Sequence, residues 1–297
     1  MLHLTARAVT AWGFAFRFQS DHHALVDLVE YCYRDLPDAP GPAAAITVRK
    51  TGRGGHGLAM TVQHPDGTIE PCGEGRTLEE MPELLWWEVN RRARASAADR
   101  VVLHAATIAD DRGAWLLCAG SQVGKSTLAA ANALRHGRHL SDDMALLADD
   151  TATVLPYARP LMLRPGGREV LVAAGRPDGA VVLPPGDAPR LAVHGDEWFL
   201  PASALGATVP AGPVPIRAIG FLERGPGAAV EPLGQASTLQ RLVSHCATLD
   251  RHGAADFRRL ERLARQSPGY QVVLGAPGEV LDLLAVVPAA PPSPASP

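Results

Sequence analysis

The stretch from 116 to 127 constrains this chain more than any other part of it. An apolar run, 114–119, has the composition of a short buried strand, and residues 128–134 have that of a helix. Between them lies a turn that ends in Gly-Lys-Ser at 124–126, the form of a P-loop with Ala119 in the position of the first glycine. A strand, such a turn and a helix in this order predict a nucleotide-binding site.

Each part of this turn has a physical role. Its backbone N–H groups can surround a phosphate at a helix N-terminus, where the helix dipole favours anions. Lys125 can reach the outer phosphates, and the Ser126 hydroxyl can bind Mg²⁺. The chain has 28 basic Lys and Arg side chains, yet only Lys50 and Lys125 are lysines, which favours a special role for the ammonium in the turn. The predicted nucleotide contacts are Gly120, Ser121, Gln122, Val123, Gly124, Lys125, Ser126 and Thr127.

Composition excludes several classes of protein. A chain of 297 residues, 46% hydrophobic and 20% charged, suggests about two globular domains. A net charge of −3 gives no reason to expect nucleic-acid binding. The four cysteines have no paired spacing, which predicts reduced thiols and no zinc site. No signal peptide and no apolar run long enough for a bilayer is visible, so we expect a cytoplasmic protein without membrane contact.

The first part of the chain, 1–98, has the pattern of a small α+β domain. The expected elements are one or two strands in 4–18, a helix over 22–36 capped by Asp21, strands at 43–49 and 58–63, and a helix that begins with a capping box at Thr77. The apolar stripe of that second helix is expected to pack on the next domain. No catalytic group is evident here, and the adjacent His22 and His23 are read as surface residues.

The second part, 99–287, is expected to contain a mixed sheet. Strand 101–109 and the P-loop strand are separated only by the turn 110–113, which forces an antiparallel hairpin, because a parallel pair needs a crossover. Further expected elements are a helix end at Gly137, a short strand 138–141, a hairpin 144–157, a loop-rich segment 165–213 with helical character at 169–174, strands 216–222 and 270–274, and helices 237–249, 255–264 and 279–286. The Pro/Ala/Ser tail 288–297 is expected to be disordered.

Two further features have the chemistry of a phosphoryl-transfer site. Asp142 and Asp143 end the strand expected after the P-loop helix, where one carboxylate can hold Mg²⁺ or its water and the other can accept a proton from a hydroxyl. The alternative is a plain turn, as expected for the Asp pair at 149–150. His104 lies in the strand beside the P-loop strand, as either a core histidine or a site residue. The other histidines, at 136, 139, 194, 245 and 252, have no convincing spacing.

Residues 103–105, 119–126 and 139–143 together resemble the core of the HPr kinase/phosphorylase family. They are more similar to the HPr-kinase-like proteins found beside ribosomally made peptide pathways, including lasso-peptide kinases. The segment 160–164 resembles the Arg-bearing segment that follows the Asp pair in that family. The resemblance covers roughly 100–285.

This resemblance implies a fold and a set of roles. The fold is the mixed-sheet P-loop architecture shared with phosphoenolpyruvate carboxykinase. Lys125 and Ser126 would bind the phosphates and Mg²⁺, and Asp143 would be the base, with Asp142 beside it. His104 would lie near the γ-phosphate and Arg164 against phosphate or acceptor. Members of the family often form oligomers.

Two positions depart from the family pattern. Gln122 stands where the bifunctional enzymes have glycine, and Met162 where they have a glutamate. Both departures argue against the reverse, phosphate-removing reaction and against HPr as the substrate. ATP-dependent phosphoryl transfer is unaffected, since it depends mainly on positioning and charge neutralisation.

The expected function is therefore an ATP- and Mg²⁺-dependent kinase that acts on a serine or threonine hydroxyl of a small protein or precursor peptide. One alternative is a kinase for a small molecule such as a sugar or an amino-acid derivative, with a closed pocket formed by 165–213. The other is a nucleotide-binding partner protein without catalysis, whose N-terminal unit is a docking module.

Overall fold

The computed structural model describes residues 4–51, 57–97, 99–173, 189, 193–194 and 197–288. Its internal contacts divide the chain into two compact units. Unit 1 comprises Met1–Ala98, Ala158–Met162 and Pro184–Pro201, and unit 2 comprises the remaining stretches. The sequence analysis predicted a single domain boundary after residue 98, whereas the two short later segments just named also belong to unit 1. In the part of the chain that is described, no helix is both long and apolar enough to cross a bilayer.

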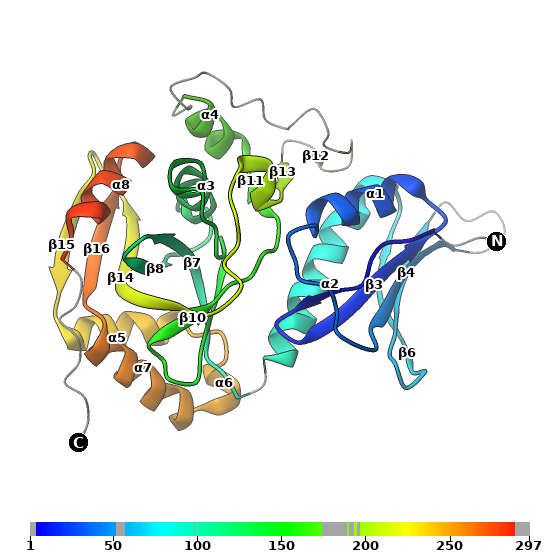
Figure 1. Cartoon of the computed structure of the whole chain (residues 1–297), viewed down its shortest axis with the longest axis horizontal. Coiled ribbons are helices and arrows are strands. Elements are labelled where there is room, and N and C mark those ends of the chain that lie inside the picture. The colour runs from blue at the N-terminus through cyan, green and yellow to red at the C-terminus, as the bar shows by residue number, and fades with distance from the viewer. Residues whose placement is uncertain are drawn as a thin grey trace. The chain divides into compact units, whose positions relative to one another are not determined.

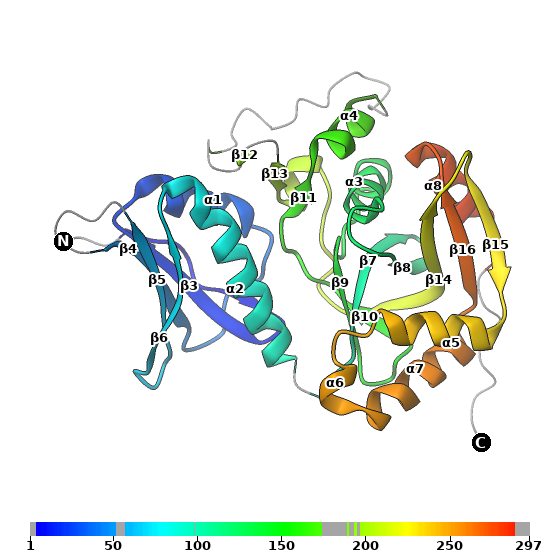
Figure 2. The same cartoon turned by 180° about the vertical axis from the view of Figure 1, so that it is seen from behind.

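Unit 1 is a sheet with two helices on one face (Figures 1 and 2). Its strands follow the order β1-β3-β4-β5-β6, with β2 paired to β3 and a parallel contact between β3 and β4. The bounds are β1 Leu4–Thr5, β2 Val9–Ala11, β3 Phe14–Ser20, α1 His23–Cys32, β4 Ala44–Lys50, β5 Leu58–Gln63, β6 Ile69–Gly75, the 3₁₀ helix η1 Leu78–Glu80 and α2 Met81–Ser96.

Both helix caps expected in unit 1 are wrong. The N-cap of α1 is His22 instead of Asp21, and its side chain makes no capping hydrogen bond. Thr77 is the N-cap of the 3₁₀ turn η1, which leads into α2, but its side chain makes no capping hydrogen bond. The Glu80 carboxylate accepts the Arg76 N–H instead (2.7 Å), so no capping box forms. The apolar stripe of α2 packs within its own unit, where the Trp86 ring centroid lies 5.2 Å from that of Phe199.

Unit 2 contains the predicted nucleotide-binding turn. Its bounds are β7 Val102–Asp110, β8 Gly113–Cys118, α3 Lys125–His136, β9 Met144–Leu147, β10 Thr153–Leu155, α4 Pro165–Ala173, η3 Ala202–Leu205, β14 Val214–Arg224, β15 Ala229–Leu233, α5 Gln235–Ser244, α6 Leu249–His252, α7 Ala254–Gln266, β16 Gly269–Leu274 and α8 Pro277–Val286. A third, small sheet has the order β11-β13-β12, formed by β11 Leu161–Leu163, β12 Val193–His194 and β13 Glu197–Leu200.

The sheet of unit 2 is mixed, as expected. Its order is β10-β9-β7-β8-β14-β16-β15, and β10 also pairs with β14. The short turn between β7 and β8 produces an antiparallel hairpin, while β8, β14 and β16 run parallel to one another. The protein is therefore an α/β protein with mixed sheets, and the strand that leads into the predicted phosphate-binding loop has an antiparallel neighbour on one side and a parallel one on the other.

Some elements of unit 2 differ from the sequence-based expectation. Residues 138–141 do not form a strand. Arg138 makes an isolated β-bridge with Thr208, and Ser141 makes one with Thr107, so the segment does not pair continuously with any one neighbouring strand. Strand β15 and the short helix α6 were not expected. Nor were β6 and the strands β11 to β13, which lie mainly in unit 1. In the loop-rich segment 165–213, α4 confirms the helical character. Residues 174–188 of that segment and the tail 289–297 lie outside the described residues.

Helices lie on both sides of this sheet (Figures 1 and 2). α3, α4 and α8 are on one side, and α5 and α7 are on the other. A large apolar core lies between the sheet and α5/α7, and it includes Leu103, Ala105, Leu116, Cys118, Leu242 and Leu260. Because side chains alternate along a strand, His104 lies on the face of β7 opposite Leu103 and Ala105. Because Leu103 and Ala105 are buried against α5 and α7, the His104 side chain points to the other face of the sheet.

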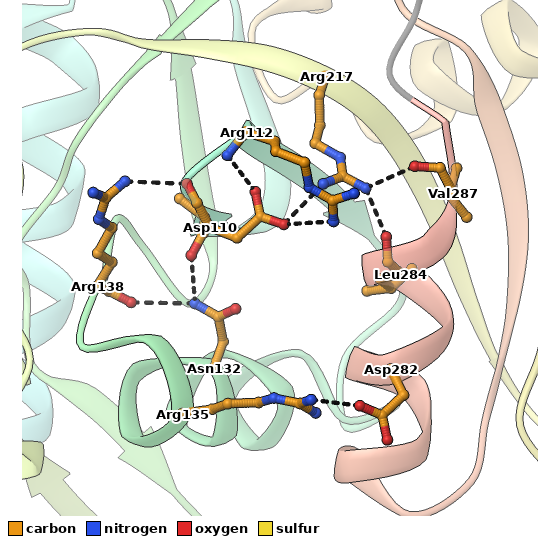
Figure 3. Close-up of polar contacts among 10 residues, drawn as sticks. Asp110, Arg112, Asn132, Arg135, Arg138, Arg217, Asp282, Leu284 and Val287 are labelled. Carbon is orange, nitrogen blue, oxygen red and sulfur yellow. Dashed lines mark hydrogen bonds and ion pairs between the residues drawn. The ribbon is translucent and has the colours of Figure 1, made fainter.

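The end of α8 is held by a buried arginine on β14 (Figure 3). The Arg217 guanidinium donates hydrogen bonds to the carbonyl oxygens of Leu284 (2.6 Å) and Val287 (3.1 Å). It also pairs with the Asp110 carboxylate, 2.8 Å away, which accepts further hydrogen bonds from the backbone N–H and the guanidinium of Arg112. Burial alone would raise the pKa of Asp110, but the hydrogen bonds from Arg112 and the charge of Arg217 outweigh it and lower that pKa. Arg217 therefore joins the β7–β8 turn, β14 and α8.

Candidate functional site

The loop between β8 and α3 is a tight turn with two residues at positive φ. Gln122 has φ 64° and Gly124 has φ 138°, both positive, and such alternation turns successive N–H groups toward one point. Arg224, at the end of β14, donates a hydrogen bond to the Gln122 carbonyl oxygen (2.8 Å). A Cβ at Gly124 would lie 3.0 Å from the Leu274 side chain, so the loop also packs closely on β16.

Lys125 begins α3 and is buried, with 6% of its surface exposed. Its ammonium donates hydrogen bonds to the carbonyl oxygens of Ala119 (2.9 Å) and Gly120 (3.0 Å). Both carbonyls belong to the start of the loop, so the Lys125 ammonium lies inside the loop and does not extend into solvent. An ammonium held there is placed to meet an anion bound by the loop.

Asp143 and His104 are brought together by strand register. β7 and β9 pair so that His104 lies opposite Met144, and Asp143 is the residue just before Met144. His104 Nε2 and Asp143 Oδ1 lie 2.9 Å apart. The same Asp143 oxygen is 3.9 Å from Lys125 Nζ. A histidine, a carboxylate and the loop lysine, which are separate in sequence, thus form one cluster at the edge of the loop.

Asp142 and Asp143 differ sharply in exposure. Asp142 is fully buried, whereas 37% of the Asp143 side chain is exposed. The preceding residue, Ser141, exchanges backbone hydrogen bonds with Thr107 of β7 (2.7 and 3.3 Å), which fixes the direction of the bend. Asp143 is therefore the carboxylate of the pair that is open to solvent.

His245 belongs to this neighbourhood, although sequence spacing gave no sign of it. Its carbonyl oxygen, at the end of α5, accepts the His104 N–H (2.8 Å), and the two ring centroids are 6.5 Å apart. Burial lowers the pKa of His245, and the nearby charges of His104 and Lys125 lower it further. A neutral imidazole therefore lies beside the cluster at neutral pH.

Arg164 is placed by α4. It is an exposed residue just before that helix, and its carbonyl oxygen accepts the Arg168 N–H (2.9 Å). One turn further, a Cβ at Gly167 would lie 2.5 Å from the Thr127 hydroxyl, so the start of α4 packs closely on the first turn of α3.

The residues expected to hold Mg²⁺ fit that ion in part. Mg²⁺ usually keeps several waters and takes one or two protein oxygens together with substrate phosphates. Ser126 has a half-buried hydroxyl in the first turn of α3, which suits this arrangement, but the carboxylate of Asp142 is shut off from solvent. Among the described residues, no group of three or more His, Cys, Asp or Glu side chains could form a metal site of its own.

The chain matches no protein-family model and no curated protein. The family resemblance inferred from the motifs therefore remains a prediction.

Proposed function

We propose that this protein is a nucleoside-triphosphate-dependent kinase that transfers the γ-phosphoryl group of ATP to a hydroxyl. The observation that carries the proposal is the position of the Asp143 carboxylate, 2.9 Å from His104 Nε2 and 3.9 Å from Lys125 Nζ. A proton acceptor next to the lysine of a phosphate-binding loop is the arrangement that such a transfer requires.

Each group of the cluster has a role in this proposal. The proton of the acceptor hydroxyl passes to the Asp143 carboxylate while the hydroxyl oxygen bonds to the γ-phosphorus, and the bond from that phosphorus to the bridging oxygen of ADP breaks. Lys125 leaves the Ala119 and Gly120 carbonyls and neutralises the phosphates. His104 orients Asp143. Mg²⁺, held by the phosphates and the Ser126 hydroxyl, would supply further charge neutralisation.

The exposure of the cluster favours a large acceptor. The His104 side chain is 40% exposed and that of Asp143 37%, so the described residues leave both open to solvent. A hydroxyl on a peptide or small protein can approach such a surface, whereas a small molecule is usually enclosed in a pocket. We therefore propose a serine or threonine of a peptide or small protein as the acceptor.

The test follows label from γ-labelled ATP and Mg²⁺ into the protein, peptide and small-molecule fractions of an extract of the source cells. Wild type is compared with Lys125→Ala and Asp143→Asn. Asp111→Asn is the matched control, because Asp111 is an exposed turn residue paired with Arg138. We expect transfer into a peptide or protein fraction that falls roughly 10²–10⁴-fold in Asp143→Asn, the usual size of general-base catalysis, and is unchanged in Asp111→Asn.

Other outcomes would change the proposal in defined ways. Label in a small molecule would replace the peptide acceptor by a metabolite. Full activity of Asp143→Asn would remove its role as the base. ATP binding without any Lys125-dependent transfer would point to the non-catalytic partner protein.

A further inference from the structure

A cavity of about 900 Å³ adjoins the predicted phosphate-binding loop. On the loop side it is lined by Val123, Gly124 and Thr127. Its other walls come from the start of α4, the end of β14, the residues after β16 and the first turn of α8. Small-molecule sites in proteins have volumes of roughly 300–1,000 Å³, so this cavity has the size of a ligand site.

The walls of the cavity are mostly aliphatic side chains and glycine backbone. Val123, Leu128, Leu274 and Val280 provide the apolar surface, and glycines provide much of the rest. Two of the described lining residues, Arg224 and Glu279, have charged side chains, and each makes a hydrogen bond to the backbone near the cavity. Arg224 donates to the Gln122 carbonyl oxygen, and Glu279 accepts the Ala276 N–H (3.3 Å). These walls suit an uncharged, flat group that has both apolar faces and polar edges.

The cavity and the His104–Asp143 cluster lie at different sides of the loop. The cavity touches Gly124 and Thr127, whereas Asp143 approaches Lys125, and neither Asp143 nor His104 is a lining residue. A chain of phosphates bound by the loop has two ends. If its last phosphate lies toward Asp143, its other end lies toward the cavity.

We infer that this cavity binds the nucleoside of the bound nucleotide. The inference rests on the proposed function and assigns to it the residues that hold the base and ribose, including Gly166 of α4 and Gly278 of α8. It also excludes the cavity as the place of the acceptor, which must reach the γ-phosphate from the side of Asp143.

Two lining glycines allow a sharp test. A Cβ at Gly166 or Gly278 would meet no atom within 4 Å, so a side chain can be added there without a clash at its first carbon. Both lie in the first turn of a helix, where a residue other than glycine improves helix propensity. Gly227, in the exposed turn between β14 and β15, is equally open but does not line the cavity, and Gly227→Phe is the matched control.

The experiment measures, by calorimetric titration in Mg²⁺, the affinity of the full chain for ATP and for inorganic tripolyphosphate. Tripolyphosphate has the phosphates but no nucleoside. We expect wild type and Gly227→Phe to bind ATP more tightly than tripolyphosphate. Gly166→Phe and Gly278→Phe should each lose at least tenfold in ATP affinity and keep the wild-type affinity for tripolyphosphate.

Different results would contradict the cavity assignment and the proposed kinase function. ATP affinity that is unchanged in both glycine variants would overturn the cavity assignment and leave the loop as a phosphate site. Loss of ATP and tripolyphosphate together in either variant, with the fold intact by circular dichroism, would also overturn it, since the effect would then lie on the loop. If wild type bound neither compound, the proposed function itself would be wrong, and the cavity assignment with it.

Discussion

Gln122 holds a left-handed backbone conformation with φ 64°. This conformation costs a residue with a Cβ roughly 1–2 kcal/mol, while glycine adopts it freely and loses about 0.5–1 kcal/mol to its larger unfolded-state entropy. We therefore predict that Gln122→Gly leaves the free energy of unfolding unchanged or raises it by up to about 1.5 kcal/mol. The difference is measured by chemical denaturation.

The neighbouring residue gives the matched comparison for this prediction. Val123 is not among the described residues with positive φ, so Val123→Gly should lower the free energy of unfolding by at least about 0.5 kcal/mol. If both glycine variants were destabilised equally, the conformation of Gln122 would not be the strained one described here.

His245 gives a prediction about pH. Its pKa is lowered in the folded chain, first by burial and then by the charges of His104 and Lys125, from an ordinary value of about 6.5 in the unfolded chain. Below that value the unfolded chain binds a proton that the folded chain does not, so stability falls as the pH drops below about 6.5. We predict that His245→Gln reduces this loss, measured as urea midpoints across that pH range.

His136 serves as the background in this experiment, because burial lowers its pKa as well. Acid destabilisation should therefore shrink in His245→Gln without disappearing. An unchanged pH dependence would mean that the ring of His245 is solvated in the folded chain.

The residues of the candidate site could be predicted from sequence only where local patterns mark them. Lys125 and Ser126 follow from the turn. Asp143 was predicted as the end of a strand over 138–141 that does not form, and it instead directly precedes β9. His245 could not be found in this way, since it is 141 positions after His104 (245 minus 104) and meets it through a backbone hydrogen bond. Only the packing of α5 beneath the sheet brings the two together.

At the scale of elements, α8 depends on Arg217. The Arg217 side chain is 2% exposed, pairs with Asp110 and binds the last carbonyls of α8. Removing one member of a buried ion pair leaves the other charge without its partner, which typically costs about 3–5 kcal/mol. Since Asp110 is partly exposed, we predict that Arg217→Met lowers the free energy of unfolding by about 3 kcal/mol, measured by denaturation.

A surface pair provides the control for Arg217. Arg265 and Glu261 are joined across one helical turn of α7, and the Arg265 side chain is 63% exposed. Arg265→Met should change the free energy of unfolding by less than about 1 kcal/mol. Equal effects of the two substitutions would contradict the anchoring role of Arg217.

Two of the strands that sequence patterns missed, β6 and β15, share a physical cause. β6 contains Pro71 and β15 contains Pro232, and each is the edge strand of its sheet. Proline is tolerated at an edge because its missing N–H has no ladder partner to lose, yet in a sequence it marks a break. The buried strands β7, β8 and β14 have long apolar runs, and these were predicted within two residues at each end.

At the scale of the whole molecule, the chain enters unit 1 more than once. Phe199 comes from a late segment, is buried, and packs beside Leu85 and Trp86 of α2. A chain that begins at Asp99 would therefore lack the partners of Phe199. We predict that it binds a hydrophobic dye and associates in size-exclusion chromatography, and that Phe199→Ser in the shortened chain reduces both effects.

The full-length protein with Phe199→Ser separates the two causes. There the substitution should destabilise the protein, because it leaves a hole in a packed core. A shortened chain that stayed monomeric without dye binding would show that unit 2 folds independently of these late segments.

The burial of Lys125 has a practical consequence for covalent chemistry. The chain has two lysines, of which Lys50 is exposed at the end of β4 and Lys125 is buried in the loop. Acylating reagents attack the unprotonated amine of an accessible lysine. Of the two lysines, the folded protein should therefore be acylated at Lys50 alone and the unfolded protein at Lys125 as well. Peptide mapping by mass spectrometry would thus report the state of the loop from a single side chain, without any knowledge of the substrate.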